Sequence, residues 1–106
     1  MHKMVVLVKA VAGRVDELAR WYDETHLPDL LAVPGLVSVE RHTMFPVKKP
    51  EGLMDWDFLL IYELEGEDPM VVLGAMAQQG VPVVCDALDS TQTLSLVAVS
   101  RVHRTE

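Results

Sequence analysis

In residues 3–11 (KMVVLVKAV), apolar side chains occupy both alternating sets of positions of an expected β-strand. Because successive side chains of a strand point to opposite faces, each face has its own set of residues: Met4, Val6 and Val8 on one, Val5, Leu7 and Val11 on the other. Residues 92–103 (QTLSLVAVSRVH) repeat this two-sided pattern. An antiparallel sheet with one face in water alternates apolar with polar side chains, so the pattern predicts a sheet that is covered on both faces.

Turn and cap signals divide the rest of the chain into further elements. We expect helices over 14–26 and 69–79, and strands over 3–11, 36–45, 56–64 and 92–103. Pro28 lacks an N–H and is expected to stop or kink the first helix near His26, and to open a further short turn that carries Leu30 and Leu31. Asp68-Pro69 and Gly80 are start and stop signals for the second helix. For residues 81–91 we expect a short turn or edge segment.

These elements follow the order βαββαβ, which is that of the ferredoxin-like α+β fold, a four-stranded antiparallel sheet with two helices on one face. The 106 residues are expected to form a single domain, 1–106, because no linker or repeat divides them. Two helices cover only one face of the sheet. A second copy of the chain is the simplest cover for the other face, so a homodimer with isologous pairing is expected.

Composition argues against several function classes. The formal net charge is −7 and the basic residues are scattered, whereas a nucleic-acid partner requires a basic stripe that neutralises phosphates. No apolar run approaches the roughly 20 residues of a membrane span, and no signal peptide is visible, so we expect a cytoplasmic protein without membrane contact. Cys85 is the only cysteine and none of the four histidines has ligand spacing with another. Neither a metal nor a cofactor is therefore expected.

Residues 21–31 (WYDETHLPDLL), followed by residues 33–36 (VPGL), resemble the dimeric α/β-barrel superfamily and, more narrowly, its EthD-like branch. In that branch an aromatic-rich first helix ends in a histidine, and a Pro-Gly turn starts the second strand. The resemblance implies two ferredoxin-like units that pair sheet to sheet into a dimeric α/β barrel, each with a cleft between sheet and helices. Members include isomerases, polyketide cyclases, monooxygenases and haem enzymes, so the fold does not fix a reaction. Residues 37–42 (VSVERH) lack the tyrosine that some relatives carry in this strand.

His26 is the main candidate for catalysis. It recurs with Leu18 and Tyr22 at helical spacing on one apolar face, at the end of the first expected helix. An imidazole titrates near neutral pH, so His26 would serve as a general base or acid near the cleft. The alternative is a buried histidine that caps the helix carbonyls left free by Pro28.

Tyr62 shares one face of its strand with Trp56 and Phe58. This row would form an aromatic wall whose tyrosine hydroxyl donates to a substrate carbonyl, or it is plain core. Arg41 and His42 are adjacent in a strand and so point to opposite faces. Either one faces the pocket, or the strand end simply emerges into solvent, and the pattern leaves both possibilities open.

Two functions are consistent with these residues. The first is a cofactor-independent isomerase or cyclase acting on a small, largely apolar, oxygenated ring compound, in which His26 moves the proton and Tyr62 or Arg41 stabilises an enolate. The residues expected to line its substrate pocket are Tyr22, Trp56, Phe58 and His42. The second is a non-catalytic module that binds such a compound. A purely structural dimeric domain, with a filled cleft, is a third possibility.

Overall fold

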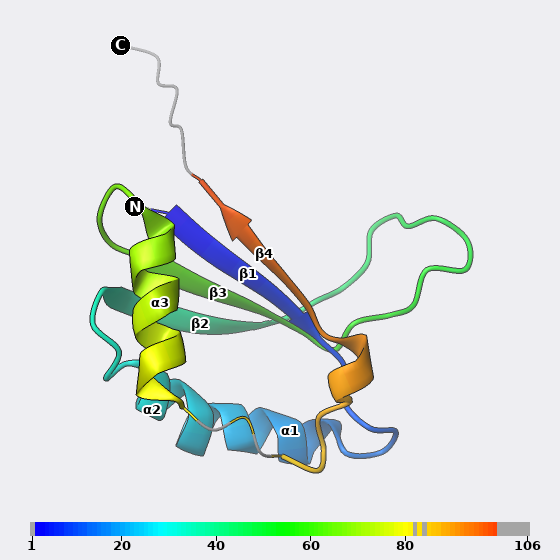
Figure 1. The fold of residues 1–106 in the computed structure, drawn as a ribbon. Coiled ribbons are helices and arrows are strands. Elements are labelled where there is room, and N and C mark those ends of the chain that lie inside the picture. Colours follow the sequence, from blue (N-terminus) through cyan, green and yellow to red (C-terminus); the bar gives the residue numbers. More distant parts are fainter. Residues whose placement is uncertain (1, 82, 84, 100–106) are drawn as a thin grey trace.

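The computed structural model describes residues 2–81, 83 and 85–99. Four strands form one sheet: β1 (His2–Val8), β2 (Leu36–Thr43), β3 (Phe58–Leu64) and β4 (Leu94–Ala98). The helical elements are α1 (Val15–Trp21), a π-helical turn (Tyr22–His26), α2 (Leu27–Leu30), α3 (Pro69–Gln79) and a 3₁₀ turn (Ser90–Gln92). Figure 1 shows the sheet with these helices.

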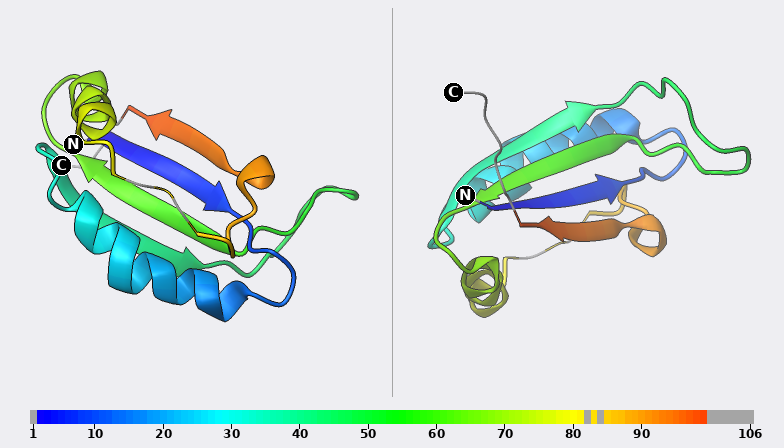
Figure 2. Two further views of the ribbon diagram at one scale, coloured as in Figure 1. Left: turned by 60° about the horizontal axis from the view of Figure 1, so that its bottom comes forward. Right: turned by 90° about the horizontal axis from the view of Figure 1, so that it is seen from above.

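The sheet has the strand order β2-β3-β1-β4, and each neighbouring pair is antiparallel. The two strands that follow each other in the chain, β2 and β3, pair directly, and β1 lies between β3 and β4. This arrangement confirms the expected four-stranded antiparallel sheet, and together with the helices it is consistent with the ferredoxin-like fold. The long β2–β3 connection, residues 44–57, extends away from the sheet (Figure 2).

The first helical segment changes its helix type near His26, where we expected it to stop or kink. After α1 the chain makes the π-helical turn, which ends at His26, and then α2, which carries Leu30. Pro28 lies in the first turn of α2, where a missing N–H costs little because first-turn donors have no intrahelical acceptor of their own. The further short turn expected at Pro28 is therefore present, and the π-helical turn before it was not expected.

The helix α3 has the bounds that its caps predict. The Asp68 side chain accepts a hydrogen bond from the Met70 amide at 2.9 Å, and Gly80 ends the helix with a left-handed φ of 64°. Strands are shorter than expected: β1 ends at Val8, β2 at Thr43, and β3 begins at Phe58. β4 ends at Ala98, and the expected positions 100–103 lie outside the described residues.

Within the segment 81–91, Leu88 makes an isolated antiparallel bridge to Ala10, and the 3₁₀ turn follows. This agrees with the expected turn or edge segment. The Asp57 side chain accepts a hydrogen bond from the Ala10 amide at 2.6 Å and so helps to hold the chain just past β1.

One face of the sheet packs beneath the helices. Its strand residues are buried: Met4, Val6 and Val8 from β1, and Phe58, Leu60, Tyr62 and Leu64 from β3. Leu18, Tyr22 and Leu30 cover them from the first helical segment, and Val72 from α3. Figure 2 shows α1 and α2 lying along the sheet.

The opposite face of the sheet is also apolar, as the alternation in β1 predicts. The register places its residues side by side across three strands: Val5 and Leu7, Leu59 and Ile61, Leu94 and Leu96. Those of β4 are the most exposed, with Leu96 at 53%. On the edge strand β2 the same face is polar and carries Ser38, Glu40 and His42.

Among the described residues there is no helix of the length and apolar character that a membrane crossing requires.

Gly35 is the glycine of this fold that is least able to accept a side chain. Its φ is +88°, and a Cβ added there would lie 2.7 Å from Cγ2 of Val72 in α3. Gly35→Ala should therefore lower the free energy of unfolding by about 3 kcal/mol, because the left-handed backbone costs about 1–2 kcal/mol and overpacking adds a similar amount. Urea unfolding followed by circular dichroism measures this change.

Gly13→Ala is the matched control, because Gly13 has a φ of +80° but no atom within 4 Å of the added Cβ. It should cost only the backbone contribution, about 1–2 kcal/mol. Equal losses in the two variants would show that Gly35 and Val72 are not in close contact.

Candidate functional site

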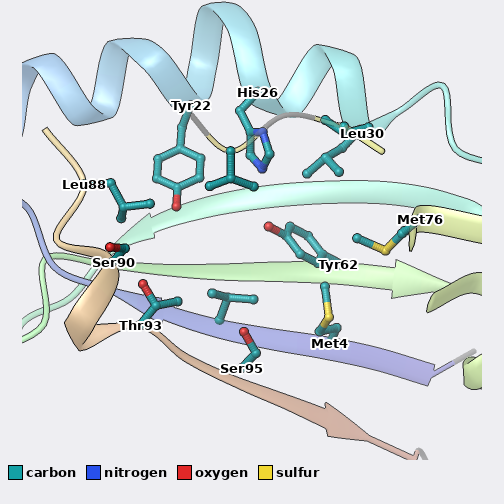
Figure 3. Close-up of a pocket in the computed structure, with 13 residues that line it drawn as sticks. Met4, Tyr22, His26, Leu30, Tyr62, Met76, Leu88, Ser90, Thr93 and Ser95 are labelled. Atoms are coloured by element: carbon teal, nitrogen blue, oxygen red, sulfur yellow. The ribbon is translucent and has the colours of Figure 1, made fainter. Parts of the chain in front are cut away.

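A pocket of about 360 Å³ lies between the helices and the buried face of the sheet (Figure 3). Its walls come from every layer: the first helical segment, β1, β3, α3, the segment after α3, and β4. The residues that line it are Met4, Val6, Tyr22, His26, Leu30, Tyr62, Met76, Val81, Val83, Leu88, Ser90, Thr93 and Ser95. The pocket therefore contains three of the residues singled out from sequence: His26, Tyr22 and Tyr62.

His26 is held in the pocket wall by its aromatic neighbours. Its side chain is buried, at 6% exposure, at the end of the π-helical turn. The imidazole stacks on the Trp21 indole, with ring centroids 4.5 Å apart and planes 12° apart, and meets the Tyr22 ring edge to face at 5.7 Å. The wider turn brings residues five apart onto one face, so it lets Trp21 stack on His26 while Tyr22 stays beside it.

Tyr22 and Tyr62 face the pocket from opposite walls, one from the helical segment and one from the central strand β3 (Figure 3). Burial raises the pKa of Tyr22 to about 12, and the nearby Cys85 adds to the effect. Burial also raises the pKa of Tyr62, to which the neighbouring Tyr22 contributes. Both hydroxyls therefore remain protonated through the physiological range and can donate hydrogen bonds.

Three small hydroxyl side chains complete the polar part of the wall: Ser90, Thr93 and Ser95. Ser90 lies in the 3₁₀ turn, Thr93 directly before β4, and Ser95 in β4. All three are exposed. Their hydroxyl groups are neither titratable near neutral pH nor aromatic, so the residue types that singled out His26 and Tyr62 did not include them. The alternation of side chains could have identified two of them. Ser95 pairs with Val6 and Val97 with Met4, and Thr93 is two residues before Ser95, so these side chains belong to the same sheet face as the buried residues of β1.

The remaining candidates do not line this pocket. Trp56 lies in the β2–β3 connection, on a second cavity of about 490 Å³ formed by residues 44–56. Phe58 is buried at the start of β3, on the same face as Tyr62 but at the far end of the strand. The alternation of side chains along the strand placed Phe58 on the correct face. Its distance from Tyr62 along β3 keeps it out of the pocket.

Arg41 faces inward and His42 outward. The Arg41 guanidinium donates two hydrogen bonds to the Asp23 carboxylate, at 2.8 and 2.7 Å, and lies 4.6 Å from the centroid of the Phe58 ring. These hydrogen bonds lower the pKa of Asp23. The pair ties the edge strand β2 to the helical segment and places Arg41 away from the pocket. His42 lies on the opposite face, where Nε2 donates to the Glu40 carboxylate at 2.8 Å.

Among the residues that the structure describes, no group of three or more His, Cys, Asp or Glu side chains is arranged to hold a metal ion.

Fourteen chains among solved structures match this fold. One is the crystal structure, at 1.40 Å resolution, of an ethyl tert-butyl ether d (EthD) family protein from Bacillus halodurans C-125. The match has a TM-score of 0.56, covers 95% of this chain and 100% of that chain, and has 14% sequence identity. At this identity the similarity shows the fold alone, which is EthD-like. No family model and no curated protein matches the sequence.

The two tyrosines of the chain both line the pocket, so their titration tests its burial. Tyrosinate absorbance of the folded protein should not rise near pH 10, where an exposed tyrosine ionises, at about 10; Tyr22 should ionise at about 12. Because the folded pKa is raised, the stabilisation by the protonated tyrosines is complete below the unfolded pKa and is lost as pH rises toward the folded pKa. The urea-unfolded chain is the control and should titrate near the ordinary value. Absorbance that rises at that ordinary value in the folded protein would mean that both hydroxyls are open to solvent.

Proposed function

We propose that the chain is an enzyme of the isomerase or cyclase type that acts on a small oxygenated ring compound by proton transfer through His26. The observation that carries the proposal is the position of a buried imidazole and two protonated tyrosine hydroxyls on the walls of one apolar pocket. The resemblance to the dimeric α/β-barrel superfamily supports the same assignment, because isomerases and cyclases occur in it.

The proposed reaction uses proton transfer by His26 and hydrogen bonds from the two tyrosines. His26 removes a proton from a carbon next to the ligand's carbonyl group, and the electrons of the broken C–H bond move onto the carbonyl oxygen. Tyr62 and Tyr22 donate hydrogen bonds to this enolate oxygen, the role that the sequence suggested for Tyr62 or Arg41. In a ligand with a carbon–carbon double bond conjugated to the enolate, the protonated imidazole returns the proton to the far carbon of that bond, the double bond shifts, and the carbonyl reforms, which completes an isomerisation. In a ligand with a second carbonyl group, the enolate carbon forms a bond to that carbonyl carbon, its C=O π electrons move onto oxygen, and the imidazole gives its proton to the resulting alkoxide, which closes a ring.

A second candidate function is a binding module that holds such a compound without changing it. The observation in its favour is the largely apolar lining of the pocket, to which Met4, Val6 and Leu30 contribute. Binding alone requires only the apolar walls and the hydroxyl groups.

The homodimer is part of the same proposal. The first helical segment and α3 both lie on one face of the sheet. On the other face the apolar side chains of β1, β3 and β4 remain partly exposed, up to 53% for Leu96. Burial of apolar surface stabilises by about 25 cal/mol per Å², so two such faces gain by packing together. Isologous pairing would turn the two sheets into the dimeric α/β barrel.

Proton exchange of 2-tetralone, a neutral bicyclic ketone, tests the catalytic function. In D₂O the wild-type protein should accelerate exchange of the protons next to the carbonyl, followed by proton NMR, and His26→Gln should abolish the acceleration. His42→Gln is the matched control, because His42 lies on the opposite face of the sheet, and it should keep the wild-type rate.

Calorimetric titration of 2-tetralone separates the two functions. Binding with no acceleration of exchange would overturn the catalytic proposal in favour of the binding module. Equal loss of exchange in the His26 and His42 variants would overturn the role of His26.

Light scattering at micromolar concentration tests the dimer. The wild-type protein should have twice the mass of the chain. Ile61→Lys, at the centre of the outer face, should convert it to a monomer, because a buried unpaired charge is costly. Val71→Lys is the control, since Val71 is 69% exposed on α3, and it should remain dimeric. A wild-type monomer, or a dimeric Ile61→Lys variant, would contradict the proposed pairing.

A further inference from the structure

We infer that the pocket selects uncharged ligands that have one polar end, and that Thr93 and Ser95 bind this end. The inference rests on the proposed function, in that this pocket is taken as the ligand site, and it adds the ligand's charge, its polarity and the residues that select them.

Among the described residues that line the pocket, none is Asp, Glu, Lys or Arg, and His26 is the one basic side chain. As the base of the proposed reaction, His26 binds the ligand in its neutral form. Moving a carboxylate or phosphate from water to these side chains then leaves the charge without a counter-charge, which is far more costly than burying a neutral group. The pocket therefore favours ketones, lactones, phenols and alcohols over acids and phosphate esters.

The polar and apolar groups are separated along the pocket. In Figure 3 the hydroxyls of Thr93 and Ser90 lie toward one end, while Met76 and Leu30 lie toward the other. The Tyr62 hydroxyl points away from Met76, toward the side where Tyr22 and Thr93 lie. Tyr22 is also close enough to Tyr62 to raise its pKa. A bound ligand would thus place its oxygen at the hydroxyl end.

The chemistry of each end fits one half of such a ligand. Serine and threonine hydroxyls both donate and accept hydrogen bonds, so Thr93 and Ser95 suit a carbonyl as well as a hydroxyl group. At the other end Met4 and Met76 supply flexible, polarisable thioethers that adapt to the shape of a ring. The volume of about 360 Å³ equals the liquid volume of about a dozen waters, which suits a compound of one or two rings.

Three compounds with the same bicyclic frame test the inference by calorimetry: tetralin, 2-tetralone and tetralin-2-carboxylate. They differ in having no oxygen, a neutral carbonyl and a carboxylate. We expect 2-tetralone to bind most tightly. The carboxylate should bind at least about tenfold more weakly than 2-tetralone, because its charge would be buried without a partner.

Two variants test the hydroxyl end. Ser95→Ala and Thr93→Val each remove a hydroxyl group from an exposed position, so the fold should tolerate them. Each should weaken 2-tetralone binding by about three- to tenfold, as expected for one lost hydrogen bond, and leave tetralin binding unchanged. Thr43→Val is the matched control on β2, outside the pocket, and should change neither.

Each contrary result would overturn a different claim. A carboxylate that binds as tightly as 2-tetralone overturns the selection against charge but leaves the pocket as the ligand site. If a variant weakens the binding of tetralin as much as that of 2-tetralone, hydrogen bonding by Thr93 or Ser95 is overturned, since the effect would then be a loss of packing. Failure of all three compounds to bind removes the pocket as the ligand site, and the proposed function falls with it.

Discussion

The packing of alternate side chains of β1 and β3 against the helices is the constraint on which the rest of this structure depends. Met4, Val6 and Val8 lie next to Leu60 and Tyr62, and this surface requires cover from the first helical segment and α3. The cover is incomplete toward β4, where every residue of the strand is exposed. The pocket occupies this incompletely covered region, so the same packing that stabilises the fold also positions the site.

The fold was largely predictable from the sequence because its signals are local. Asp68-Pro69 and Gly80 fixed the bounds of α3, and alternation in β1 identified both faces of the sheet. The helix type of the segment before Pro28 was not predictable in this way. Whether a proline ends a helix depends on whether its position needs an N–H, and the π-helical turn before it could not be deduced from residue types alone.

The candidate site was predictable in part, for a related physical reason. Periodicity assigns a side chain to a face, and it assigned Tyr22, His26 and Tyr62 correctly to the buried one. It does not give position along an element, which is why Phe58 shares the face of Tyr62 but lies near Arg41. The bidentate pair of Arg41 with Asp23 joins residues far apart in the sequence, and no local pattern distinguishes such a structural arginine from one that binds a ligand.

The exposed position of Thr93 and Ser95 has a consequence for how such proteins diverge. Substitutions at exposed positions usually change stability little, so side chains at this edge can be replaced while the buried core of β1 and β3 is retained. Under the proposed role of Thr93 and Ser95, ligand preference and folding stability depend on separate parts of the chain. Mutation could then change the bound compound without first acquiring compensating changes in the core.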